Sequence, residues 1–129
     1  MAEKYASIDV GLKRIGVALC LHENIVTPQE AILRKNRNQA ANDVNIFLKE
    51  WEITKLIVGF PSSSEDTQNR IKHFVNLLEL KIPYEFQEEN MSSIEAEEMM
   101  KGEIKYKRDG RVDSLAAKII LERYLARKK

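Results

Sequence analysis

The sequence has little of the residues on which cross-links and several kinds of site depend. It contains one cysteine, so no disulfide can form within the chain. Cys20 lies in an apolar, strand-like stretch, which indicates a buried structural thiol rather than a reactive one. Its two histidines, His22 and His73, are too few for a zinc site, and we expect both on the surface. These features favour an intracellular, cytoplasmic protein without histidine-based catalysis.

Long hydrophobic runs are also missing. No apolar run reaches the roughly 18 residues that a membrane span needs, and we therefore expect no membrane partner. The sequence shows no repeat and no low-complexity linker. Its hydrophobic and charged fractions, 43% and 32%, are typical of globular domains. We predict a single domain over residues 1–129.

The chain as a whole has little excess charge of either sign, but some of its segments do have an excess. The net charge is +1. Residues 85–98 carry six acids and no base, whereas residues 101–129 carry ten bases and four acids, a balance of +6. Such asymmetry can mark an anionic partner such as nucleic acid, or it can simply solvate helix faces. Charge alone leaves both interpretations open.

The spacing of apolar residues predicts an α/β fold with five strands. Strands are expected over 4–10, 14–21, 24–34, 53–60 and 81–88, and helical spacing follows over 40–51, 62–80, 92–102 and 112–124. This order, βββαβαβαα, predicts an antiparallel meander followed by parallel strands that are joined through helices. We expect a five-stranded mixed sheet with helices on both faces.

Asp9 interrupts the first apolar strand, in the stretch "ASIDVGLKRIGVAL". An unpaired ionised carboxylate in a dry strand costs several kcal/mol, so Asp9 needs a partner. Lys13 and Arg14 are the nearest candidates, and a salt-bridged turn acid is one interpretation. The other is a ligand role, because the glycine after Asp9 would let a phosphate or a metal approach the backbone.

Three further acids stand where a ligand site is expected. Glu88 and Glu89 end the fifth strand, and because successive side chains alternate, only one of them can face a site shared with Asp9. Asp113 begins the last helix, where an acid also complements the helix dipole. Together such carboxylates suit two divalent cations about 4 Å apart, which assist the in-line hydrolysis of a phosphodiester.

Four stretches in order resemble the YqgF-type family, over essentially the whole chain: "DVGLKRIGVAL", "LIVGFP", "EENMSSIEAEE" and "VDSLAAKIIL". These small RNase H-like proteins are described as nucleases of precursor 16S ribosomal RNA and once as Holliday-junction resolvase homologues. The resemblance implies an RNase H-like fold and metal-dependent nuclease activity. The element order worked out above agrees with that fold.

The resemblance also implies roles for single positions. The residues that match the family's catalytic, metal-binding acids are Asp9, Glu89 and Asp113. The residues that match its basic pair and its threonines, and would contact nucleic acid, are Lys13, Arg14, Ser92 and Ser93. Arg111 lies in a basic loop before the last helix, where its position fits either a further phosphate contact or a side chain that only solvates the loop.

The chain departs from the family pattern at several points. Asn90 replaces an expected arginine, and Glu88 replaces the usual aspartate. The loop "SSSEDT" over 62–67 is shorter and lacks glycine. Many RNase H-like nucleases have an acid near the end of the fourth strand, where this chain has residues 59–61, "GFP". Glu89 would then supply that charge from the neighbouring strand.

The leading hypothesis is an endonuclease that uses Mg²⁺ or Mn²⁺ to cut structured RNA, in the maturation of precursor 16S ribosomal RNA. The alternatives are a nuclease of branched DNA and a nucleic-acid-binding module without catalysis. An actin-like ATPase would need a second domain and more phosphate loops than the sequence contains. The oligomeric state stays open, since a junction enzyme would need a dimer whereas an RNA-trimming enzyme could act alone.

Overall fold

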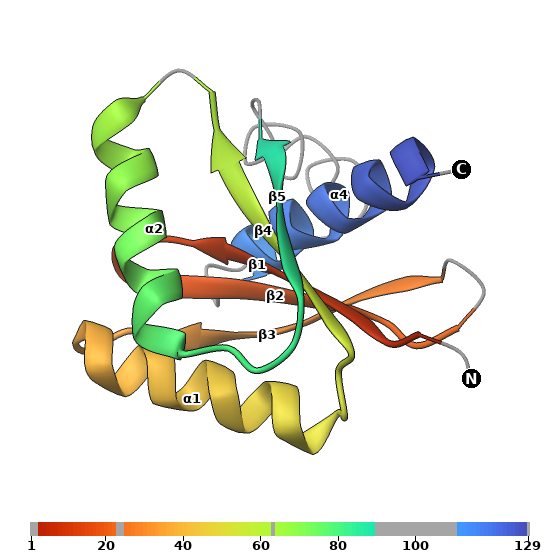
Figure 1. Ribbon diagram of the computed structural model, residues 1–129, viewed down its shortest axis with the longest axis horizontal. Coiled ribbons are helices and arrows are strands. Elements are labelled where there is room, and N and C mark those ends of the chain that lie inside the picture. The colour runs from red at the N-terminus through yellow and green to blue at the C-terminus, as the bar shows by residue number, and fades with distance from the viewer. Residues whose placement is uncertain (1–2, 23–24, 63, 90–110, 129) are drawn as a thin grey trace.

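The computed structural model describes residues 3–22, 25–62, 64–89 and 111–128, which form a five-stranded sheet with helices against it (Figure 1). The strands are β1 (Tyr5–Val10), β2 (Arg14–Cys20), β3 (Val26–Leu33), β4 (Lys55–Pro61) and β5 (Tyr84–Glu89). The helices are α1 (Arg37–Glu50), α2 (Glu65–Leu78) and α4 (Arg111–Lys128). The helix expected over 92–102, with Ser92 and Ser93, lies outside the described residues.

The strand order is β3-β2-β1-β4-β5, which places β1 in the middle of the sheet. Strand β2 pairs antiparallel with both β1 and β3, and β4 pairs parallel with both β1 and β5. This topology confirms the predicted meander and the predicted parallel strands. We call the end of the sheet where β1, β4 and β5 finish its carboxyl end. The turn from β1 to β2 and the last residues of β3 lie there too.

Each face of the sheet is covered by helices, as predicted. On one face, α1 and α2 pack Val44, Ile71 and Phe74 into a core with strand residues such as Ile8 and Val58. On the other face, α4 packs residues that include Ile120, Leu121 and Tyr124 against β1, β2 and β4. Figure 1 shows α4 crossing the sheet on the side away from α1 and α2. Burial on two faces explains why β1 and β4 are nearly continuous apolar runs.

Capping residues set where α1 and α2 begin. The Asn36 side chain accepts a hydrogen bond from the Gln39 backbone nitrogen, and Gln39 completes a capping box. Asn36 is thus the N-cap of α1. Ser64 caps α2 in the same way, by accepting from the Thr67 nitrogen. Both helices start at the carboxyl end of the sheet, because α1 follows β3 and α2 follows β4.

Small side chains let α4 lie close to the sheet. Ser7, Ala116 and Ala117 are fully buried, and the Ser7 hydroxyl donates to the Ala117 carbonyl oxygen at 2.6 Å. At its other end, α4 continues through Lys128, in a tail that is exposed but helical. Within the residues that the structure describes, no helix is long and apolar enough to cross a membrane. Cys20 is buried, as expected.

Candidate nuclease site

Asp9 lies near the carboxyl end of the central strand. It pairs with Gly16 of β2 and is half-buried. Two residues earlier, Ser7 points to α4, with which it forms its hydrogen bond. Because strand side chains alternate, Asp9 lies on the same, α4-covered side of the sheet. The carboxylate thus lies where the buried strand ends and its side chains become partly exposed.

The backbone brings the positions of the other two acids to the same end of the sheet. Glu89 is the last residue of β5 and pairs with Pro61 at the end of β4, the strand between β5 and β1. Asp113 is the third residue of α4. The side chains of Glu89, Asp113 and Arg111 lie outside the described part of the structure. Their roles, like those of Ser92 and Ser93, stay predictions.

A hydrogen bond holds the start of α4 against β2. Ser114 is buried, and its hydroxyl accepts from the Val17 backbone nitrogen at 3.5 Å. Val17 follows Gly16, the residue that pairs with Asp9. The β2–β3 register shifts between Ile15 and Val17, an irregularity that lies at the same point. The first turn of α4 is therefore placed beside the end of β1 that carries Asp9.

Glu88 lies on the opposite side of the sheet from Asp9. It is exposed and borders a surface hollow with Phe60, Phe86 and Gln68, on the side that α2 covers. Phe86 also packs against the core that α1 and α2 form. Glu88 therefore cannot share a site with Asp9. Of the two glutamates, Glu89 is the one whose position allows it.

Gln87 is a candidate ligand that the sequence did not reveal. It is 9% exposed, and no described residue donates a hydrogen bond to its buried Oε1. Its neighbour Glu85 reaches Tyr124 of α4, so alternation places Gln87 on the α4 side as well. It pairs with Gly59, on the strand next to Asp9. The sequence pattern around Gln87 is the same as for an exposed residue of an edge strand, so its burial could not be predicted from the sequence.

The donor set at this end of the sheet fits a hard divalent cation. Mg²⁺ and Mn²⁺ prefer carboxylate and amide oxygens, which Asp9 and the orphaned Gln87 Oε1 supply. A buried amide oxygen without a donor costs free energy that a bound cation would recover. Among the described side chains, no three of the histidine, cysteine, aspartate and glutamate type gather into a metal-binding group.

A tight turn presents the basic pair that follows Asp9. The Gly11 nitrogen donates to the Arg14 oxygen at 3.0 Å, and a Cβ on Gly11 would lie 2.6 Å from that oxygen. Lys13 is exposed, and Arg14 is half-buried. Arg34, which the sequence did not single out, donates from Nη1 to the Gly11 oxygen at 2.8 Å and fastens the end of β3 to this turn.

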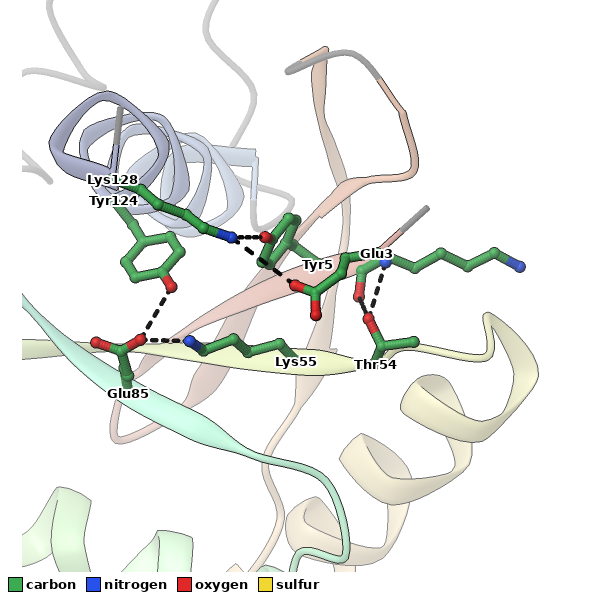
Figure 2. A network of polar contacts seen from close by, with 8 residues as sticks. Glu3, Tyr5, Thr54, Lys55, Glu85, Tyr124 and Lys128 are labelled. Carbon is green, nitrogen blue, oxygen red and sulfur yellow. Dashed lines mark hydrogen bonds and ion pairs between the residues drawn. The ribbon is translucent and has the colours of Figure 1, made fainter. Parts of the chain in front are cut away.

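A second polar cluster lies at the opposite, amino end of the parallel strands (Figure 2). Glu85 forms an ion pair with Lys55 and accepts from the Tyr124 hydroxyl at 2.9 Å. The Lys128 ammonium donates to the Tyr5 hydroxyl. The hydrogen bond between Glu85 and Lys55 lowers the pKa of Glu85 and raises that of Lys55. These contacts join the last turns of α4 to three strands, so they stabilise the fold.

The sequence profile of the family described as RuvX, Holliday junction resolvase, matches residues 3–127. The chain belongs to the RuvX family. A RuvX relative from Sulfurovum sp. (strain NBC37-1), named "putative pre-16S rRNA nuclease", is 64% identical over 126 residues, which cover 95% of this chain and 98% of the relative. A relative of the same name from Sulfurimonas denitrificans is 53% identical and covers 97% and 98%. The resemblance to the YqgF-type family is confirmed.

Solved structures confirm the RNase H-like fold that was expected for this RuvX chain. RuvC from T. thermophilus, solved in complex with a Holliday junction substrate, matches with a TM-score of 0.61 at 14% identity over 98% of this chain and 96% of that one. The fowlpox virus resolvase, in a complex with junction DNA, matches with a TM-score of 0.58 at 14% identity over 97% of both chains. At such identities these likenesses establish the architecture alone.

Proposed function

We propose that this chain is a metal-dependent endonuclease that hydrolyses phosphodiester bonds in precursor 16S ribosomal RNA. The proposal is carried by one observation: Asp9, on the central strand, lies at the same end of the sheet as the last residue of β5 and the first turn of α4. The names of the RuvX relatives supply the substrate. We place the activity in the cytoplasm.

Each residue of the proposed site has a distinct task. Asp9, Glu89 and Asp113 would hold Mg²⁺ or Mn²⁺, with the Gln87 amide oxygen beside them. When bound, the cations activate a water molecule and neutralise the departing oxygen. The half-buried position of Asp9 restricts its contact with water and so strengthens its attraction for a cation.

The cations and hydroxyls around the acids would bind the substrate. Lys13 and Arg14 follow Asp9 in the tight turn, where they can contact phosphates on either side of the bond that is cut. Arg111, Ser92 and Ser93 would extend this contact. Without these groups, the repulsion between the acids and the phosphodiester would oppose binding.

A branched-DNA nuclease is the second candidate, and a specific observation favours it. The model of the family that matches residues 3–127 is described as a Holliday junction resolvase. Such an enzyme would act on two strands and would require a homodimer. A third interpretation, a nucleic-acid-binding module without catalysis, is motivated by Asn90, which replaces an arginine of the family pattern.

The deciding experiment compares cleavage of a labelled precursor 16S ribosomal RNA and of a four-way DNA junction. Wild-type protein and Asp9→Asn are assayed with Mn²⁺, with Mg²⁺ and with a chelator. We expect metal-dependent cutting of the RNA that falls more than about a hundredfold in Asp9→Asn, because even outer partners of metal ligands cost 10- to 100-fold. Asp43→Asn, which changes the same group on α1, is the matched control and should cut normally.

The other outcomes decide between the alternatives. Cutting of the junction but not of the RNA would select the branched-DNA nuclease. Binding without cutting by the wild type would select the non-catalytic module. Undiminished cutting by a folded Asp9→Asn protein would remove Asp9 from the site.

A further inference from the structure

A pocket with basic walls opens at the carboxyl end of the sheet, on the side that α1 and α2 cover. It has a volume of about 580 Å³. Its charged and aromatic walls are formed by Arg34, Lys35, Arg37, Arg70, His73 and Phe74. Among the described residues that line it, none is an aspartate or a glutamate. We refer to it as the arginine pocket.

The cations of this pocket lie close to one another, and no carboxylate of the described residues lines the pocket with them. Burial, and then the neighbouring charges of Arg37 and Arg70, lower the pKa of Arg34. Within the described residues, none of these three arginines forms an ion pair with an acid. Arg37 instead donates to the His73 Nε2 at 2.8 Å, which requires that nitrogen to be an acceptor. Such mutual repulsion is relieved when an anion binds.

The start of α1 makes these charges still less favourable in the absence of an anion. Arg37 is the first residue of α1, where the helix dipole is positive and disfavours a cation. The first turn of α1 has no acidic residue, whereas the first turn of α2 has Glu65 and Asp66. The local electrostatics therefore favour a bound oxyanion, unlike those of a surface whose charges are only solvated.

The arginine pocket lies next to the proposed nuclease site. Arg34 lines the pocket and also donates to the Gly11 oxygen, two residues after Asp9. Leu12, in the same turn, is 66% exposed and forms another wall of the pocket. A polynucleotide held at Asp9 can therefore cross this turn and reach the pocket with a later part of its backbone.

We propose that the arginine pocket binds a backbone phosphate of the nucleic-acid substrate, at a distance from the phosphodiester that is cut. Guanidinium groups match phosphate with paired, charge-assisted hydrogen bonds, and exposed Arg37 and Arg70 are placed to provide them. The nature of the ligand rests on the proposed function. A phosphate in this pocket lies across the β1–β2 turn from the acids. The pocket therefore lengthens the segment of nucleic acid that the protein contacts.

The test measures binding separately from cutting. Arg37→Gln, Arg70→Gln and the double variant are titrated with a fluorescein-labelled RNA fragment and a labelled four-way DNA junction, in chelator and at several KCl concentrations. We expect the double variant to bind about tenfold more weakly at low salt. The slope of log K against log salt should fall by roughly 0.7 to 0.9 for each phosphate contact that is lost. Arg34 is left in place, because it fastens the β1–β2 turn and lies over Phe74.

The matched control is Lys81→Gln, which removes one exposed charge outside the pocket, between α2 and β5. It should leave both affinity and slope unchanged, and thermal unfolding should show that all variants fold. A double variant with the affinity and slope of the wild type would overturn the pocket, and intact metal-dependent cutting would then leave the proposed function standing. Weakened binding with no cutting by the wild type would support the pocket and overturn the proposed nuclease. A wild type that binds neither probe would overturn both.

Discussion

The two ends of the parallel strands differ in how their polar groups are satisfied. At the amino end, Lys55 pairs with Glu85 and Lys128 donates to the Tyr5 hydroxyl (Figure 2). Arg127 lies 3.6 Å from the same Glu85 carboxylate. The Glu85 carboxylate at this end is paired with cations, and the contacts of Tyr124, Arg127 and Lys128 hold α4 on the sheet. Shifted pKa values at this end thus have a structural cause, even though such shifts often mark active sites.

At the carboxyl end, polar groups are gathered without their complements. Arg34, Arg37 and Arg70 share a pocket that is lined by no acid of the described residues, and no described residue donates to Gln87 Oε1. A folded chain tolerates such deficits where a ligand removes them. For this reason we place the proposed binding groups at the carboxyl end, and we assign the Glu85 and Lys55 cluster at the amino end to stability.

The largest expected effect on stability is at Ser7, where α4 approaches the sheet most closely. Ser7→Val places two methyl groups in a fully closed space and removes the hydrogen bond to Ala117, so we expect the free energy of unfolding to fall by about 2 kcal/mol or more. Urea denaturation measures this. Ser7→Ala, which loses only the hydrogen bond, should cost about 1 kcal/mol. Equal losses in both variants would show that α4 can move away from β1 without cost.

The next effect separates stability from activity at Gln87. Gln87→Leu keeps the volume but removes the unsatisfied oxygen, so the protein should be as stable as the wild type or more stable. Cleavage should fall about tenfold and need more Mn²⁺, if this oxygen supports the metal. Urea denaturation and a Mn²⁺ titration of cleavage measure the two effects. A destabilised variant would mean that the oxygen is satisfied in solution, and a fully active one would exclude it from the metal site.

The smallest effect is expected at the amino end, from Glu85→Gln. Because the Lys55 hydrogen bond lowers the pKa of Glu85 in the folded state, the carboxylate stabilises the protein at neutral pH. That contribution is lost as the pH falls through the ordinary carboxyl range and below it. The melting temperature of the wild type should therefore fall more steeply between pH 7 and pH 3 than that of Glu85→Gln, while cleavage stays unchanged.

Glu52→Gln is the control for this pH effect. The Glu52 carboxylate lies 3.8 Å from the Lys4 ammonium and is 81% exposed, so its pair is screened by water. Its acid dependence should match that of the wild type. If Glu85→Gln reduced cleavage in a folded protein, the structural interpretation of the amino end would be wrong.

Much of the fold could be predicted from local patterns. Alternation and short connections predicted the meander, and helical spacing after Asn36 predicted α1. Asp9 could be recognised as unusual because a charge in an apolar strand is visible in the sequence itself. Gln87 could not be recognised, since its burial depends on α4, a helix that lies more than twenty residues later in the chain.

The arginine pocket shows most clearly where sequence reasoning stops. Arg34, Arg37 and Arg70 come from the end of β3, the start of α1 and the middle of α2. Their separate positions look like ordinary surface charges. Only the packing of α1 against α2, on one face of a sheet with this strand order, brings them into one pocket.

The sequence by itself determined which segments form helices and strands, that Asp9 interrupts an apolar strand, and which family the chain resembles. It could do so because side-chain period and short motifs are local properties of the chain. The tertiary structure alone decided which polar groups meet without partners, because burial and charge proximity are set by residues far apart in sequence. The local pattern explains how this chain folds, and the charges that described residues leave unpaired at one end of its sheet are where we propose that it binds nucleic acid.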